Sequence, residues 1–260
     1  MLLPALNRPL RNWPQQTVWI VGASSGIGAA LASQLLALGA RVILSARGVD
    51  SLHAVAARQP RAIVLPLDVS QPAAWQQAWD SLQQQDALPD LVVFCAAAYR
   101  PERCWDIRQQ QVSDTLQTNL AGVYYGLETM LPAMMARRQG GIALVASVAG
   151  YVGLPGACVY GPSKAALINL AELLHAELHQ HDMQVYLINP GFVATRLTAK
   201  NDFAMPALLQ PQDAARAIVR GLEQGRFEIH FPRRFTLWIK LLALLPYRLR
   251  LPLLRHLARN

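Results

Sequence analysis

A glycine-rich turn between an apolar run and a helical pattern constrains the fold of this chain more than any other sequence feature. The turn reads Val21-Gly22-Ala23-Ser24-Ser25-Gly26-Ile27-Gly28. It follows Thr17–Val21, which is typical of a buried parallel strand, and opens a helical pattern over 28–38 that stops at Gly39. Glycines let the backbone approach phosphates, and the free N–H groups of a helix N-terminus attract anions. A plain strand-to-helix turn is the alternative, but the pattern favours a dinucleotide pyrophosphate site.

A second pattern lies far downstream, where Ser147 precedes Tyr160 by thirteen residues and Lys164 follows one helical turn later. Tyr160 and Lys164 stand at i and i+4, so a helix places them on one face. An ammonium beside a phenol favours the phenolate, and we therefore expect Lys164 to lower the pKa of Tyr160. Ser147 adds a hydroxyl for the same substrate oxygen. An ordinary surface pair is the alternative, and the upstream turn favours proton transfer.

Together the two motifs resemble the classical short-chain dehydrogenase/reductase family over about residues 17–231. The family's Thr-Gly-x-x-x-Gly-x-Gly turn matches Gly22, Gly26 and Gly28, with Val21 where threonine is usual. Its catalytic residues fall on four positions: Asn119, Ser147, Tyr160 and Lys164. The order and spacing of these motifs agree along most of the chain.

This resemblance implies hydride transfer between a nicotinamide and a carbonyl or alcohol carbon of a small-molecule substrate. Tyr160 is expected to give or take the proton, and Ser147 to polarise the substrate oxygen. Lys164 is expected to tune Tyr160 and hold the nicotinamide ribose, and Asn119 to position a water. The expected cofactor contacts lie in the glycine turn and near the ends of later strands: Gly22, Ser24, Ser25, Gly26, Ile27, Gly28, Arg47, Asp68, Val69, Ala96, Asn119, Tyr160, Lys164, Pro190, Gly191, Val193 and Thr195.

One segment departs from the family pattern. Phe94-Cys95-Ala96-Ala97 stands where the family has Asn-Asn-Ala-Gly. The asparagine that braces the family's central sheet is absent, and Cys95 is suited to a small buried position. This departure keeps an alternative open, a nucleotide-binding sensor or scaffold of the same fold with little turnover.

The end of the second expected strand bears on cofactor choice. Sites for NAD place an acid there to bind the ribose 2′-hydroxyl. Here the segment is Leu44-Ser45-Ala46-Arg47-Gly48, with no carboxylate before Asp50. Arg47 is suited to a 2′-phosphate, so NADP(H) is favoured over NAD(H). A solvated arginine at the start of a loop is the alternative.

Strand and helix patterns alternate along the chain, which predicts an α/β fold, a Rossmann-type doubly wound parallel sheet of about seven strands. Strands are expected at 17–21, 41–46, 62–67, 91–96, 142–147, 184–188 and 227–231, and helices at 28–38, 51–58, 72–84, 107–137, 159–181 and 211–223. We divide the chain into a lead-in over 1–16, a catalytic domain over 17–231 and an extension over 232–260. Substrate specificity is expected in the loops at 99–105, 150–156 and 196–209.

Composition agrees with one intracellular α/β domain. The chain has 260 residues, of which 53% are hydrophobic. Its three cysteines show neither metal nor redox spacing, which fits a reducing, cytoplasmic compartment. Residues 1–16 contain no apolar core of signal-peptide length. His175 and His179 stand at i and i+4, but a histidine pair alone is weak support, so no metal site is expected.

The C-terminal extension is basic and rich in leucine. Residues 226–260 contain eight Arg or Lys and one acid, Glu228, so they carry +7 of the net +8. Pro246 and Pro252 are expected to cut the segment into short pieces. Such a segment fits reversible contact with a membrane surface, and a lid or oligomer contact is the alternative. Nucleic acid is not expected as a partner, since no such motif accompanies the charge. We also expect a homo-oligomer.

Overall fold

The computed structural model describes residues 5–203 and 205–259. The first four residues of the expected lead-in, Met1–Pro4, and the last residue of the extension lie outside the described residues.

Seven parallel strands form one sheet in the order β3-β2-β1-β4-β5-β6-β7. The chain moves outward from β1 in one direction and then from β4 in the other, so the expected doubly wound sheet is confirmed. Most strands are apolar along their length because both faces of the sheet are covered. The strands are β1 (Thr17–Val21), β2 (Arg41–Ser45), β3 (Ala62–Val64), β4 (Leu91–Phe94), β5 (Gly141–Val145), β6 (Gln184–Pro190) and β7 (Glu228–Phe231).

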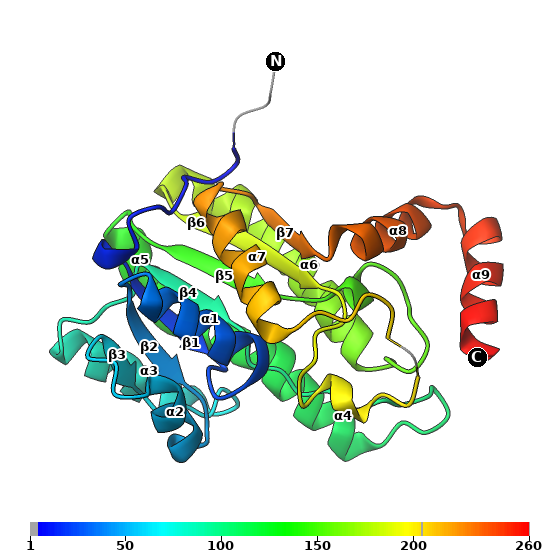
Figure 1. The fold of residues 1–260 in the computed structure, drawn as a ribbon, viewed down its shortest axis with the longest axis horizontal. Helices are drawn as coiled ribbons and strands as arrows, with labels where there is room; N and C mark the ends of the chain where they lie inside the picture. Colours follow the sequence, from blue (N-terminus) through cyan, green and yellow to red (C-terminus); the bar gives the residue numbers. More distant parts are fainter. Residues whose placement is uncertain (1–4, 204, 260) are drawn as a thin grey trace.

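Helices cover both faces of the sheet (Figure 1). One face packs against α1 (Gly26–Ala37), α2 (Val49–Ala56) and α7 (Pro211–Glu223). The other packs against α3 (Pro72–Gln84), α5 (Gly122–Ala136) and α6 (Tyr160–Leu178). Along β1 the side chains alternate between the two cores, because successive residues of a strand point to opposite faces.

Several expected elements begin or end one to three residues away from the observed bounds, and two differences have a clear cause. The strand expected at 62–67 ends at Val64, just before Pro66, which has no N–H to donate to the sheet. The single helix expected at 107–137 is three segments: α4 (Gln109–Leu116), a π-helical turn η2 (Gln117–Ala121) and α5. This wider turn contains Asn119. π-Helical turns inside α-helices occur frequently at functional sites.

The described part of the lead-in is ordered and packs along the core. The Asn7 side chain donates to the Val185 carbonyl at 2.8 Å and accepts from the Val185 N–H at 3.1 Å. The short 3-10 helix η1 (Trp13–Gln15) buries Trp13 in the core beside α1 and α7. Residues 5–16 therefore pack against one side of the domain.

The C-terminal extension forms two helices, α8 (Arg233–Leu244) and α9 (Tyr247–Arg259), and α9 stands apart from the sheet (Figure 1). Pro252 lies inside α9, so the expectation that it interrupts the helix is wrong. Pro252 falls in the second turn of α9. Because proline has no N–H, the backbone carbonyl of Arg248, four residues earlier, receives no helical hydrogen bond from it. Within the described residues, no helix is both long enough and apolar enough to cross a membrane.

Helix α8 is anchored to the core. The Phe235 ring lies 5.5 Å from the Phe192 ring, and the fully buried Thr236 hydroxyl lies 2.6 Å from His230 Nδ1. Glu228 of β7 pairs with Lys240 of α8 and accepts from the Tyr151 hydroxyl. Burial acts to raise the pKa of Glu228, but its hydrogen bonds and the Lys240 charge hold that pKa below its usual value. A packed helix and a polar network thus fix α8 in place.

Candidate active site

The sequence-predicted site residues gather at the carboxyl edge of the sheet. The glycine turn follows β1, Ala96 follows β4, Ser147 follows β5, and Gly191 follows β6. Parallel strands bring their carboxyl ends to one edge, where doubly wound sheets bind ligands. The fold therefore explains how residues more than a hundred positions apart form one site.

The glycine turn is a tight cradle in which a Cβ atom on any of its three glycines would collide with neighbouring protein atoms. Gly22 has φ of +100°, and a Cβ there would overlap the backbone of Ala96. A Cβ on Gly28 would overlap the carbonyl oxygen of Gly22. On Gly26 it would meet the Thr195 side chain at 3.0 Å, so the loop after β6 lies directly beside the turn. The close packing of the turn against the loops after β4 and β6 thus requires glycine at these positions.

The turn opens directly into α1. Ser25 precedes the helix, and within the described residues its side chain accepts no hydrogen bond from the helix N-terminus. Ser25 therefore does not cap the first-turn N–H groups, and the positive end of the helix dipole there favours an anion. The Gly28 N–H is the exception, because it contacts the Cys95 thiol. Ser24, Ser25 and Ile27 all lie in this turn or at the helix start.

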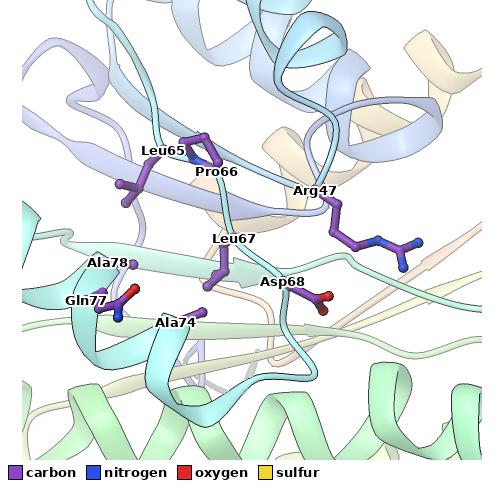
Figure 2. Close-up of a pocket in the computed structure, with 8 residues that line it drawn as sticks. All are labelled: Arg47, Leu65, Pro66, Leu67, Asp68, Ala74, Gln77 and Ala78. Atoms are coloured by element: carbon purple, nitrogen blue, oxygen red, sulfur yellow. The ribbon is translucent and has the colours of Figure 1, made fainter.

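A pocket of about 410 Å³ lies beyond the ends of β2 and β3. Figure 2 shows Arg47 and Asp68 on one side of it and Gln77 of α3 on the other. Burial acts to raise the pKa of Asp68, but hydrogen bonds from Ser70 and the charge of Arg47 leave that pKa below its usual value. The lining includes neither Tyr160 nor Lys164, so Arg47 and Asp68 form a separate end of the site. Its cation and its carboxylate suit the adenosine half of a dinucleotide.

The second end of the site contains Ser147, Tyr160 and Lys164. Ser147 caps the short helix η3 (Val148–Gly150) by accepting from the Ala149 N–H at 3.1 Å. Tyr160 is the first residue of α6, and Lys164 follows one turn later. The buried Lys164 ammonium donates to the Val145 carbonyl at 2.9 Å and lies 5.5 Å from the centre of the Tyr160 ring. The end of β5 and the start of α6 thus fix all three side chains.

Burial has the largest effect on the pKa values of Tyr160 and Lys164. It raises the pKa of Tyr160 to about 12, although a hydrogen bond with Ser147 opposes the rise. It also lowers the pKa of Lys164 to about 8. The expectation that the pKa of Tyr160 lies below its usual value is therefore wrong for this structure, because removing the phenolate from water costs more than the neighbouring groups restore.

Asn119 is a fully buried brace between two parts of the site. Its side-chain oxygen accepts from the Ala98 N–H at 2.7 Å, and its amide donates to the Ala98 carbonyl at 3.0 Å. The same amide donates to the Ser163 hydroxyl at 3.1 Å. Asn119 thereby ties the loop after β4 to α6, next to Lys164. The expected positioning of a water by Asn119 stays a prediction.

The segment that departs from the family pattern fits this chain's own packing. Cys95 is partly buried beside the Gly28 N–H and Lys164. Burial raises the pKa of the Cys95 thiol to about 11, so the thiol stays neutral beside the ammonium. Ala97 has a backbone conformation outside the left-handed region, so no glycine is required there. Alanine at this position therefore causes no backbone strain.

The remaining expected cofactor contacts lie near the glycine turn or in the neighbouring loops. Val69 packs against Gly122 at the start of α5, where a Cβ on the glycine would meet the Val69 carbonyl at 2.7 Å. Pro190 ends β6, and Gly191 packs against Phe235 of α8. Val193 is buried in the core that includes α1, and Thr195 lies beside Gly26.

Two contacts near the start of α6 do not follow from the sequence patterns. The Tyr99 ring lies 4.9 Å from the Tyr160 ring, and its hydroxyl donates to Asn201 at 2.7 Å. Tyr99 was included only as part of a specificity loop. The thiols of Cys104 and Cys158 lie 3.2 Å apart, although the linear spacing of the cysteines gave no sign of a pair. The fold joins two loops that are distant in sequence.

His175 and His179 stack with their ring centres 6.3 Å apart. Across the residues that the structure describes, no three or more His, Cys, Asp or Glu side chains are grouped so as to hold a metal ion.

A doubly wound sheet with a glycine cradle at its carboxyl edge defines a dinucleotide-binding α/β protein. A family model described as short chain dehydrogenase matches residues 16–205. An uncharacterized oxidoreductase of Myxococcus xanthus is 32% identical over 235 residues, which are 89% of this chain and 93% of the relative. The chain therefore belongs to the short-chain dehydrogenase/reductase family and is an enzyme of the oxidoreductase class.

Solved structures show the same fold. A short-chain dehydrogenase/reductase of Burkholderia phymatum in complex with NAD has a TM-score of 0.81 at 22% identity, covering 89% of this chain and 94% of that one. A short-chain dehydrogenase of Sphingobium yanoikuyae in complex with NADPH has a TM-score of 0.76 at 23% identity, covering 86% and 92%.

Proposed function

We propose that this enzyme is an NADP(H)-dependent oxidoreductase that interconverts a carbonyl and an alcohol, with Tyr160 as proton donor and acceptor. The observation that carries this proposal is the joint placement of Ser147, Tyr160 and Lys164 beside the glycine cradle at one edge of the sheet. Family membership and the relatives with bound NAD or NADPH support a nicotinamide cofactor.

The chain's residues fit such a cofactor in two places. The cradle at Gly22, Gly26 and Gly28 and the start of α1 suit the pyrophosphate, and Arg47 with Asp68 suits the adenosine end. Arg47 is the reason to propose NADP(H) over NAD(H), because a guanidinium matches a 2′-phosphate. When bound, the cofactor supplies or accepts the hydride.

The chain supplies the proton and holds the substrate oxygen. With a pKa of about 12, Tyr160 retains its proton at neutral pH and is ready to donate it to a carbonyl oxygen. Ser147 orients that oxygen with its hydroxyl. Lys164, whose pKa is about 8, is charged at neutral pH and stabilises the phenolate as the proton leaves.

We propose an apolar substrate, on the basis of the aromatic side chains near the site. Tyr99 packs edge-on against Tyr160. Phe192, just after β6, packs against Phe203 with ring centres 5.7 Å apart and against Phe235. Of these rings, Tyr99 and Phe203 come from the loops at 99–105 and 196–209 that we expect to set specificity.

The direct test is turnover on apolar ketones and aldehydes with NADPH, and on the matching alcohols with NADP, followed by absorbance. We expect NADPH consumption with at least one class of apolar carbonyl compound. The alternative, a sensor or scaffold with little turnover, predicts that the cofactor binds in a titration but that no compound in the panel is converted.

We also propose that the C-terminal extension makes reversible contact with anionic membrane surfaces through α9 and the free face of α8. Trp238 is 72% exposed and Leu244 is 81% exposed, so the anchored helix still presents large apolar side chains to solvent. On α9, Leu249, Leu253 and Leu257 are exposed beside the exposed Arg248 and Arg255. Phe235 packs on the core and is not part of this surface, which corrects the expectation for the whole extension.

We expect the intact protein to sediment with anionic vesicles at low salt and less well at high salt. Because each basic residue near an anionic surface contributes about 1 kcal/mol, the double change Arg248→Gln and Arg255→Gln should weaken binding about 30-fold. Arg58→Gln, at the exposed end of α2, is the matched control and should bind as the wild type does. Sedimentation that is the same with neutral vesicles, or that persists in the double variant, would contradict the proposal.

Three further expectations remain proposals. The division at 1–16, 17–231 and 232–260 is one, and a cytoplasmic location is another. The third is a homo-oligomer, which exposed apolar side chains outside the extension support, among them Leu116, Tyr124 and Leu173. Light scattering on the intact protein and on a variant lacking α9 tests whether copies associate and whether the extension joins them.

A further inference from the structure

Two cysteines from distant parts of the sequence meet at the edge of the proposed substrate site. Cys104 lies in the loop after β4, and Cys158 lies two residues before Tyr160. Their sulfur atoms are 3.2 Å apart, and Cys104 is exposed to solvent. A separation this short means that a disulfide needs little movement of either loop.

The backbone around the pair is fixed by its own hydrogen bonds. The Glu102 N–H donates to the Gly156 carbonyl at 3.2 Å, and the buried Glu102 side chain accepts from the Val159 N–H at 2.7 Å. Glu102 and Ala157 also form an isolated parallel bridge. The meeting of the two thiols therefore follows from a built contact between the two loops rather than from two free side chains.

The same loop reaches the proposed proton donor. Tyr99 packs on the Tyr160 ring, and its carbonyl accepts from Lys200 at 2.8 Å. The segment from Tyr99 to Cys104 thus runs from the Tyr160 ring to the cysteine pair, and it is held at one end by Lys200 and at the other by the Glu102 contacts. A covalent link at Cys104 would fix this segment to the start of α6.

We propose that Cys104 and Cys158 form a reversible disulfide that locks the loop after β4 against the segment leading into α6 and thereby restricts access to the substrate site. The oxidant is a low-molecular-weight disulfide. The exposed Cys104 thiolate attacks one of its sulfur atoms, forms a mixed disulfide and releases one thiol. The Cys158 thiolate then attacks the Cys104 sulfur, closes the internal disulfide and releases the second thiol. Two protein thiols are oxidised and one external disulfide is reduced to two thiols.

The chemical part of the proposal is tested by treating the intact protein with oxidised glutathione, denaturing it and counting alkylated thiols by mass spectrometry. We expect alkylation to fall from three cysteines to one, Cys95, with a linked peptide pair containing Cys104 and Cys158. Dithiothreitol should restore all three. This count does not depend on any enzymatic activity, so it stands apart from the proposed function.

The matched control is Cys104→Ser, in an exposed loop position. It should form no internal disulfide, and Cys158→Ser should behave likewise. A product that carries only glutathione adducts, or a link that involves Cys95, would overturn the proposal. Because the link closes a loop of about 54 residues, oxidation should also raise the Tm of the wild type by about 5–10 °C and leave the Tm of Cys104→Ser unchanged.

The gating part rests on the proposed function and needs a verified substrate. Oxidation should lower turnover severalfold in the wild type while the affinity for NADPH stays the same, because the cofactor pocket at Arg47 lies elsewhere. Cys104→Ser should keep its turnover under the same treatment. Formation of the disulfide with unchanged turnover would show that the link does not restrict the site.

Discussion

Tyr160→Phe should lower turnover by about 100-fold or more, the contribution typical of a positioned general acid. The change removes only the phenolic hydroxyl, and the ring retains its edge-on packing against Tyr99. We therefore expect the variant to fold and to bind NADPH with an affinity close to that of the wild type. The measurement is steady-state turnover on a verified substrate, together with a fluorescence titration of the cofactor.

Tyr124→Phe is the matched control for this prediction. Tyr124 is 50% exposed on α5, so the loss of its hydroxyl should leave both turnover and cofactor binding unchanged. Turnover of Tyr160→Phe that stays near that of the wild type would show that another group gives the proton. A parallel loss of NADPH binding would show instead that the hydroxyl is needed to build the site.

The state of Tyr160 in the structure favours the donor role. The phenol is partly buried beside Ser147, Tyr99 and Cys95, and its removal from water raises its pKa to about 12. A group with so high a pKa holds its proton at neutral pH, as reduction of a carbonyl requires. Lys164, with a pKa of about 8, brings positive charge to within 5.5 Å of the ring centre, which lowers the cost of leaving a phenolate behind.

The sequence was enough to predict the order of the sheet elements and their fold class. Buried parallel strands such as β1 and β5 read as apolar runs, and the glycine turn marks where the first helix begins. Strand ends were less predictable. The strand expected at 62–67 stops at Val64, since Leu65 and Leu67 are as apolar as the strand itself and only Pro66 signals the end.

The break in the helix expected at 107–137 left no signal in the sequence. Residues 117–121 form a wider turn although three of the five, Gln117, Leu120 and Ala121, are good helix formers. The reason is tertiary: Asn119 bonds Ala98 and Ser163, and an extra residue in the turn sets the direction of its side chain. The sequence pattern of residues 107–137 alone does not include Ala98 and Ser163, whose hydrogen bonds with Asn119 favour the π-helical turn.

The cysteine pair and the ion pair that anchors α8 could not be predicted from the sequence for the same reason. Cys104 and Cys158 are 54 positions apart, and only the packing of two loops brings them together. Charge counting treated Lys240 as one more basic residue of the extension, whereas the fold pairs it with Glu228. Long-range contacts of single side chains depend on the completed fold, while motif spacing and periodicity are local properties.

Arg47→Asp should weaken the binding of NADPH roughly 10- to 100-fold, the scale of a lost charge-assisted hydrogen bond. Arg47 is exposed at the edge of the pocket that also contains Asp68, so the new carboxylate would repel a 2′-phosphate from the same position. NADH has a ribose hydroxyl there, and a carboxylate can accept its hydrogen bond. The affinity for NADH should therefore be equal to or greater than that of the wild type.

Titrations of both cofactors against the wild type, Arg47→Asp and Arg58→Asp give the measurement. Arg58 is exposed beyond the C-terminal end of α2 and is outside the pocket lining, so its change should affect neither cofactor. If Arg47→Asp weakens both cofactors equally, the guanidinium does not distinguish the 2′-phosphate, and the proposed preference for NADP(H) is wrong. If only NADPH weakens, the end of β2 sets the cofactor preference through the charge of one side chain.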